Sequence, residues 1–157
     1  MTATTTRNNP NWLQQLQRRY TDAPKIVKVG YPEGTEAATL SYGDGTRVVD
    51  VAVANEFGTD NTPARPFMRL SFSDIKNQCA PIFNQSVVAL NNNNTQQYDQ
   101  SLDTAGSLAA GIIKQTITDL RSPPNSQFTI DKKGSSNPLI DTGLMRQTAT
   151  YKIVDKQ

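Results

Sequence analysis

The chain has 157 residues, enough for one domain with a core of its own, so it needs neither disulfides nor a structural metal to fold. Its 16 Lys and Arg residues against 14 Asp and Glu residues give a net charge of +2, without the basic excess typical of proteins that mainly neutralise phosphates. It has no histidine and a single cysteine, Cys79, which excludes Ser-His-Asp and Cys-His catalysis, a disulfide framework and a cysteine-based metal cluster.

Uncharged polar residues fill much of the chain, with 13 Asn, 12 Gln and 18 Thr, a composition that suits a part that docks against other proteins. No apolar run approaches the ~18 residues of a membrane-spanning helix. Residues 1–8 are polar and lack the apolar centre of a signal peptide. We therefore expect a soluble protein kept in a reducing cytoplasm, with a flexible tail over 1–8 and a single domain over 9–157.

The first third of the chain alternates helical and strand patterns. An asparagine, a proline at the first helical position and apolar residues at helical spacing predict a short helix over 9–20. β-Branched residues predict a strand over 26–31 and a second over 40–42, followed by a glycine-rich turn over 43–45. Residues 48–57 have valines that favour a strand, but several apolar positions share one helical face, and we favour a helix.

A second amphipathic helix is predicted over 73–90, after a break in the pattern. Gly58 tolerates the left-handed backbone that ends a helix, and two prolines make residues 60–66 an extended loop. The interior Pro81 should kink or split the new helix, because an interior proline costs ~3 kcal/mol of helix stability. Four asparagines at 91–94 form a connector. The expected apolar face comprises Ile75, Cys79, Ile82, Phe83, Val87 and Leu90.

The longest helix is predicted over 95–120, capped by Thr95 and with charges that complement the helix dipole. A patch of small residues on it allows close approach of another backbone: Gly106, Ala109, Ala110 and Gly111. Residues 122–138 are rich in Ser, Pro, Asn and Gly, which predicts a long loop with a short strand over 127–130. With a final strand over 147–154, the chain reads as an α+β domain whose small, mostly antiparallel sheet packs against two or three helices.

Residues 139–143, Leu-Ile-Asp-Thr-Gly, are the segment most suggestive of an enzyme, because they resemble the active-site turn of retropepsin-like aspartic proteases. In a homodimer, two copies of Asp141 would share one proton. Only 14 residues follow this segment, too few for the flap and barrel strands that such a protease needs downstream, and the next residues, Leu-Met-Arg, differ from its usual sequence. We favour the structural alternative, in which Asp141 and Thr142 cap a short helix or turn over 143–147.

Glu56, Arg65 and Arg69 form a second charged cluster. An enzyme could use Glu56 as a general acid or base tuned by arginine. We favour an ion pair that joins the helix end to the loop over 59–66, because a single acid without a second carboxylate at fixed spacing is weak evidence for catalysis. The lysines at 132–133 are expected to be solvated surface, and Cys79 a small buried hydrophobe.

Two segments together carry a family resemblance: the first comprises residues 53–59 and 63–69, and the second residues 138–146. Their order is strand, first segment, two helices, second segment, strand over residues 25–154. The motif residues are Glu56, Phe57, Gly58, Pro63, Arg65, Pro66, Phe67 and Arg69 in the first segment, and Asp141, Thr142, Gly143 and Arg146 in the second. This combination resembles the tail completion, or head–tail joining, family of tailed bacteriophages.

The resemblance implies a non-enzymatic α+β virion protein, with no cofactor and no metal. Such a protein forms a ring, commonly of six copies, at the neck where the tail meets the head, and is in the host cytoplasm during assembly. The implied partners are further copies of the chain, the tail terminator or tail tube protein and the head connector or adaptor proteins. Genome DNA would pass through the lumen without sequence-specific binding, and no membrane is involved.

Alternatives remain in two classes. A tail terminator or another neck or head-completion component has a similar size and composition, and a homodimeric aspartic protease using Asp141 is the distant alternative. Under the family reading, the stiff proline-containing loop docks against neighbours, and Arg65 forms a planar fork to Glu56 or to a carboxylate of the neighbouring subunit. Gly143 allows a tight turn, with Leu144 anchoring it in the core. Packing within one domain is equally open at each of these residues.

Overall fold

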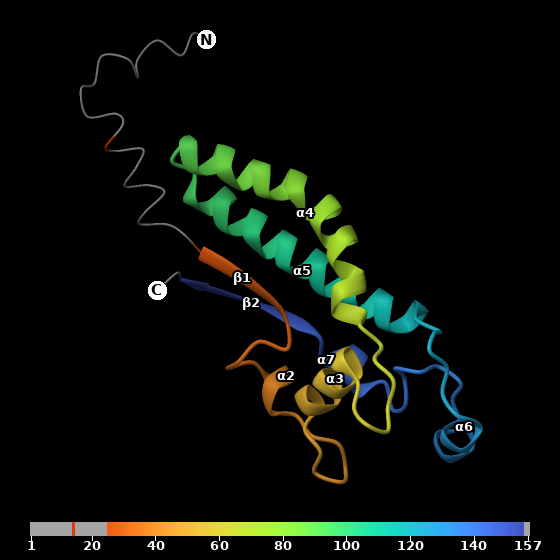
Figure 1. Ribbon diagram of the computed structural model, residues 1–157. Helices are drawn as coiled ribbons and strands as arrows, with labels where there is room; N and C mark the ends of the chain where they lie inside the picture. Colours follow the sequence, from red (N-terminus) through yellow and green to blue (C-terminus); the bar gives the residue numbers. More distant parts are fainter. Residues whose placement is uncertain (1–13, 15–24, 156–157) are drawn as a thin grey trace.

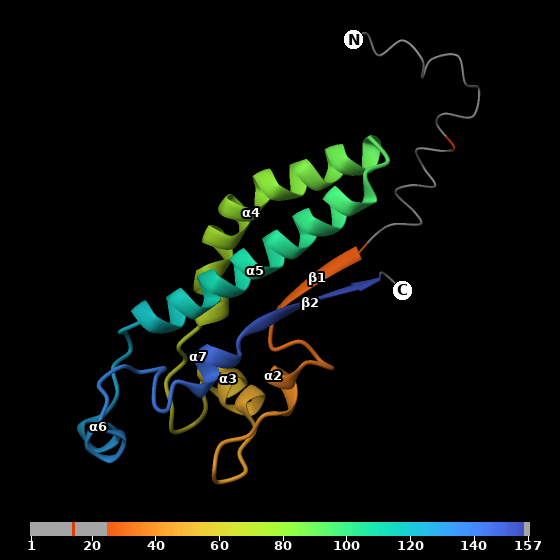
Figure 2. The same cartoon turned by 180° about the vertical axis from the view of Figure 1, so that it is seen from behind.

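The computed structural model describes Gln14 and residues 25–155, so the tail over 1–8 and, apart from Gln14, the helix expected over 9–20 lie outside the described residues. The described part contains six helices and one two-stranded antiparallel sheet, which confirms the expected α+β class. Two long helices, α4 and α5, form a hairpin in which α5 lies between α4 and the sheet (Figures 1 and 2). The short helices α2, α3 and α7 gather at one end of the sheet, and α6 projects beyond them.

The sheet pairs β1 (Lys25–Gly30) with β2 (Thr150–Asp155), so that Lys25 lies opposite Asp155. The strands predicted over 26–31 and 147–154 are confirmed to within a few residues. An isolated two-stranded sheet is marginally stable in water, so its packing against α5 (Thr95–Asp119) is what makes it persist. Val27 and Val29 are partly buried against the two long helices, as the strand alternation requires.

Helix α4 (Phe67–Asn91) begins six residues before the predicted start and continues through Pro81 as one helix, which bends along its length in Figure 1. Its core face is also rotated relative to the prediction. Phe83 and Val87, expected in the core, are 42% and 43% exposed, whereas Ser71 and Ser86 are buried. The serines can be buried because each hydroxyl donates to a carbonyl three residues earlier in the same helix.

Helix α5 carries the predicted apolar stripe, from Tyr98 to Leu120. Its cap is Asn94 and not Thr95, because the Asn94 side chain accepts a hydrogen bond from the Gln97 amide at 3.0 Å. Cys79 is 2% exposed, with its thiol 3.6 Å from the carbonyl oxygen of Ala105, and burial raises the pKa of the thiol. The prediction that Cys79 is a small buried hydrophobe is confirmed.

Among the shorter elements, α3 (Val48–Phe57) and α7 (Leu144–Thr148) confirm the helices favoured from the sequence, and the turn over 43–45 is present. The strand over 40–42 is wrong: Ser41 makes only a single bridge to Arg47, and the short helix α2 (Glu36–Thr39) precedes it. The strand over 127–130 is also wrong.

Helix α6 (Gln127–Lys133) occupies that position instead. Ser126 caps its first turn, and Gly134 ends it in a left-handed conformation. These two capping residues outweigh the β-propensity of the residues between them. None of the helices within residues 25–155 is long and apolar enough to cross a membrane.

The main core lies where α3, α7, the end of α5 and the start of α4 meet. It contains Phe67 from the first motif segment and Leu139 and Met145 from the second. Its buried members are Val48, Ala52, Phe67, Ile113, Ile117, Leu120, Leu139, Met145 and Ala149. The two segments that resemble the phage family therefore share one hydrophobic core.

Gly106 is needed where the ring of Tyr151, on β2, lies on α5. A Cβ atom at Gly106 would lie 2.3 Å from Cδ2 of Tyr151, whereas nothing lies within 4 Å of a Cβ at Gly111 in the same helix. We expect Gly106→Ala to destabilise the fold by about 1–3 kcal/mol through overpacking. Gly111→Ala should stabilise it by about 0.5–1 kcal/mol, because alanine favours a helix. Urea denaturation followed by circular dichroism measures both, and equal effects of the two substitutions would contradict the close approach.

Candidate functional site

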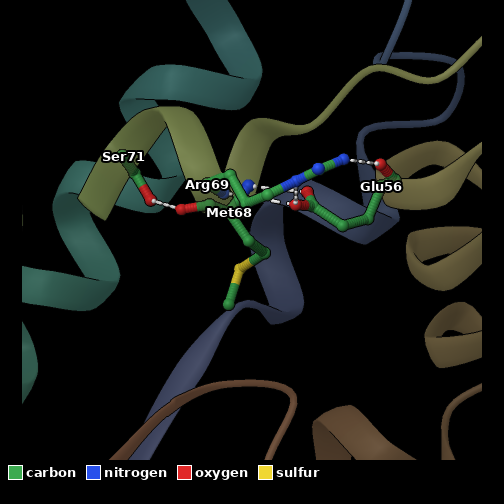
Figure 3. Close-up of polar contacts among 4 residues, drawn as sticks. All are labelled: Glu56, Met68, Arg69 and Ser71. Atoms are coloured by element: carbon green, nitrogen blue, oxygen red, sulfur yellow. Dashed lines mark hydrogen bonds and ion pairs between the residues drawn. The ribbon is translucent and has the colours of Figure 1, made fainter. Parts of the chain in front are cut away.

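Glu56, in the last turn of α3, caps the beginning of α4 (Figure 3). Its side chain is buried and accepts hydrogen bonds from the backbone amides of Met68 at 2.9 Å and Arg69 at 3.2 Å. The Arg69 guanidinium adds a bond from Nε to the carboxylate at 3.1 Å, and one from Nη2 to the Glu56 backbone carbonyl at 3.1 Å. The predicted ion pair between the helix end and the following segment is therefore made by Arg69.

This arrangement is a helix cap supplied from a different helix. Pro66, at the N-cap position, provides no side-chain hydrogen bond, so the free amides of the first turn of α4 depend on Glu56. A carboxylate at a helix N-terminus also interacts favourably with the helix dipole. Both Glu56 oxygens are occupied in this way, which leaves the group suited to holding two helices together and not to proton transfer.

The loop between α3 and α4 is closed by hydrogen bonds and close contacts within its own backbone. Gly58 has a φ of +79°, and a Cβ there would lie 2.9 Å from the Ala64 nitrogen. Thr59 and Thr62 exchange backbone hydrogen bonds, and the Arg65 amide donates to the Asn55 carbonyl at 2.6 Å. The expected extended loop is thus a closed turn, with Pro63 on its exposed surface.

Arg65 does not bind Glu56, and that prediction is wrong. Its side chain is buried and donates to the carbonyl oxygens of Pro123 at 2.9 Å and Pro124 at 3.2 Å, and to Oδ1 of Asn125 at 3.1 Å. Burial lowers the pKa of the guanidinium. With its fork filled inside the chain, Arg65 has little exposed surface for a carboxylate of a neighbouring subunit.

A second cation, Lys133, holds the far end of the loop over 122–138. Lys133 Nζ donates to the carbonyl oxygens of Asn137 at 2.6 Å and Ile140 at 2.9 Å, so this lysine is not solvated surface as expected, although Lys132 is exposed. Burial lowers the pKa of the Lys133 ammonium group. The Asn137 side chain donates to the Thr118 carbonyl at 2.9 Å and thereby ties the loop to the end of α5.

We call Arg65, Asn125, Lys133 and Asn137 the loop clasp. Asn125 completes it, because its side-chain nitrogen donates to the Asn137 carbonyl at 3.3 Å. The sequence drew attention to Arg65 and Lys133 but predicted other environments for them, and it gave no sign of Asn125 or Asn137. Their partners are mostly backbone carbonyls, which every residue has, so no pattern of side chains marks them in advance.

The second motif segment begins α7 through Thr142 and Gly143. The Thr142 hydroxyl accepts a hydrogen bond from the Leu144 amide at 3.3 Å, and Gly143 takes a φ of +81°. The predicted cap is confirmed for Thr142, but Asp141 is exposed and does not cap α7. Leu144 packs partly buried against the main core, as expected, and Met145 is the fully buried anchor beside it.

Met145 is 2% exposed, and its carbonyl accepts a bond from the Tyr31 hydroxyl at 2.8 Å. Arg146, the last residue of the second motif segment, is half-buried in α7.

A cavity of about 390 Å³ lies between α3 and the second segment. Its lining includes Asn55 from the first segment, Asp141 from the second and Lys133 from the loop clasp. Among residues 25–155, no three His, Cys, Asp or Glu side chains are placed to hold a metal ion. The arrangement as a whole holds loops and helices together through buried hydrogen bonds.

Glu56→Ala should lower the free energy of unfolding by about 2–4 kcal/mol, because two amides and a guanidinium lose their partner. Arg69→Met should cost less, since both amide bonds to Glu56 remain. Glu33→Ala removes the same group from an exposed position and serves as the control, with no change expected. Urea denaturation measures all three, and a Glu56→Ala midpoint equal to that of Glu33→Ala would disprove the cap.

Arg65→Lys should loosen the loop over 122–138, because one ammonium group cannot reach the three oxygens that the planar fork spans. Hydrogen exchange measured by mass spectrometry should show faster exchange of peptides from this loop. Arg69→Lys is the matched control and should leave their exchange unchanged. Unaltered exchange in Arg65→Lys would mean that the fork does not hold the loop.

In comparisons with known proteins, no family model, curated protein or solved structure matches the chain.

Proposed function

We propose that the protein is a structural virion protein that joins the tail of a bacteriophage to its head. In this role several copies, six in the usual arrangement of the family it resembles, form a ring between the head connector and the tail tube or terminator. The protein needs no cofactor, and it is not an enzyme. It is made in the host cytoplasm and ends at the neck of the virion.

One observation carries the proposal: the motif residues hold the fold together. The charged members Glu56, Arg65 and Arg69 are engaged with backbone groups, and Phe67 and Met145 bring the two segments into one core. Residues used in this way support a rigid scaffold and leave little capacity for acid–base chemistry. A rigid part with preformed loops also loses less entropy on docking, which favours assembly.

The surface supports binding to other proteins. Three phenylalanines are largely exposed: Phe57 at 69%, Phe72 at 66% and Phe128 at 77%. Large exposed aromatic side chains are enriched where proteins bind one another. The net charge of +2 is close to balance, and a ring of such subunits would let DNA slide through where a strongly basic ring would retain it.

The aspartic protease alternative finds less support. The Asp-Thr-Gly turn leads into helix α7 and not into a strand, and its threonine hydroxyl is bonded to the first amide of that helix. Cleavage of virion proteins by the purified protein that disappears in Asp141→Asn would favour the protease and contradict the proposal.

The decisive experiment is electron microscopy of a lysate from a phage with a nonsense mutation in this gene. We expect filled heads beside separate tails of normal length, and attached tails again when the wild-type gene is supplied from a plasmid. Overlong tails would assign the protein to tail termination instead. Intact infectious particles would disprove a role in the neck.

A further inference from the structure

Helix α6 is a projecting element with no buried residue. Figures 1 and 2 show it at the end of the molecule beyond α3 and α7. It has only seven residues, and helices this short are unstable alone in water. Its stability comes from caps at both ends, at Ser126 and Gly134, and from a side-chain bond from Gln127 to Asp131 at 2.8 Å.

The loop clasp fixes the direction in which α6 projects. Arg65 holds the segment before the helix through the carbonyls of Pro123 and Pro124, and Lys133 holds its last turn through those of Asn137 and Ile140. Arg65 is buried and Lys133 is partly buried, so both cations hold α6 from within the fold. The chain thus presents α6 in one orientation, which lowers the entropy lost when it binds.

The outer face of α6 combines an aromatic ring with a positive charge. Phe128 is the most exposed of the large apolar side chains in the described residues, at 77%, and Lys132 lies four residues later on the same helical face. A binding surface for this face needs apolar side chains with carboxylates close to them.

The molecule has such a surface at the end opposite α6. A groove of about 840 Å³ runs between α5 and β2, lined by the apolar residues Ile153 and Val154 and by three acidic residues against one lysine, Lys25. Ile153 is partly buried against the core at its base. The carboxylates are those of Asp99, Asp103 and Asp155. Lys25 pairs with Asp99 and also interacts electrostatically with Asp155, and Asp103 accepts a hydrogen bond from the Tyr151 hydroxyl. One ammonium group against three carboxylates leaves the groove with a net negative charge.

The groove includes Lys25 and Asp155, which lie where β1 begins and β2 ends, and this end of the sheet is opposite to α6 in the molecule (Figure 1). The two surfaces therefore cannot meet within one copy. A contact between unlike surfaces of identical copies is heterologous and repeats from copy to copy, giving a ring where the rotation between copies closes and an open filament where it does not.

We propose that α6 of one copy inserts Phe128 into the α5–β2 groove of the next copy, with Lys132 beside the groove carboxylates. This interface deepens the proposed function and rests on it, since it names the surfaces through which the ring forms.

Sedimentation velocity of the purified full chain over a range of concentrations tests the interface. We expect the wild type to self-associate and Phe128→Asp to weaken the association by roughly tenfold to a hundredfold, since a buried phenylalanine is lost. Lys132→Glu should weaken it too, and added salt should weaken the wild type. Leu70→Asp is the matched control: Leu70 is 57% exposed on α4, and an acidic residue suits the first turns of a helix, so association should be unchanged.

A mixing experiment shows whether the interface joins these two surfaces. Thr104→Arg places a bulky cation in the groove, which reduces its negative charge and leaves α6 intact, whereas Phe128→Asp alters α6 and leaves the groove intact. Each variant should be monomeric alone, and the mixture should form a dimer that grows no further, because only one intact pair of surfaces exists. A monomeric wild type, normal association of Phe128→Asp, or no dimer in the mixture would each overturn the proposal.

Failure of this interface and failure of the proposed function give different results. If the nonsense mutant leaves heads and tails unattached but Phe128→Asp still forms rings, the joining role stands and the interface lies elsewhere. If the interface holds in solution but the nonsense mutant yields infectious particles, the protein assembles for another purpose. Circular dichroism of each variant confirms that it is folded before association is measured.

Discussion

The bond network of Glu56 is the interaction on which the remaining structure depends. It fixes where α4 begins, and the position of α4 determines how it packs on α5 and hence how α5 lies on the sheet. The carboxylate also closes the loop between α3 and α4, since the Arg69 side chain reaches back to the end of α3. One buried acid therefore connects the small-helix end of the molecule to the long hairpin. A chain that caps a long helix from its neighbour gains a defined angle between the two, which a local cap would not provide.

The two cations that fix the loop over 122–138 donate hydrogen bonds to backbone carbonyls and not to carboxylates. Arg65 and Lys133 both direct their hydrogen bonds to main-chain oxygens, which accept from a charged donor more strongly than from a neutral one. Removing charge from these side chains would leave several carbonyl oxygens without these donors. The loop is therefore held largely through its backbone, and Asn125 and Asn137 are the loop side chains that also take part. Such a loop can vary its exposed residues without losing its position.

The helices and strands that depend on residues close together in the chain could be predicted from the sequence. Both strands, α3, α7 and most of the α5 stripe follow from apolar spacing and from glycine or proline positions. The start of α4 could not be predicted, because its cap comes from a residue eleven positions earlier. The rotation of the α4 core face was missed because buried serines that bond to their own helix look like surface residues in a sequence pattern. The role of Arg65 could not be predicted either, since main-chain oxygens leave no trace in the sequence.

The pairing of β1 with β2 has a consequence for the order of folding. The two strands come from opposite ends of the described chain, with all six helices between them. During synthesis, Lys25–Gly30 can rest on α5 once that helix exists, but one row of its backbone groups stays unpaired until Thr150–Asp155 leaves the ribosome. Contacts of such long sequence separation form late and slowly. The groove beside β2 forms at that same step, so a nascent chain lacks the acidic surface until residues 150–155 have been made and have paired, and chains that stop before them are kept out of any assembly that uses it.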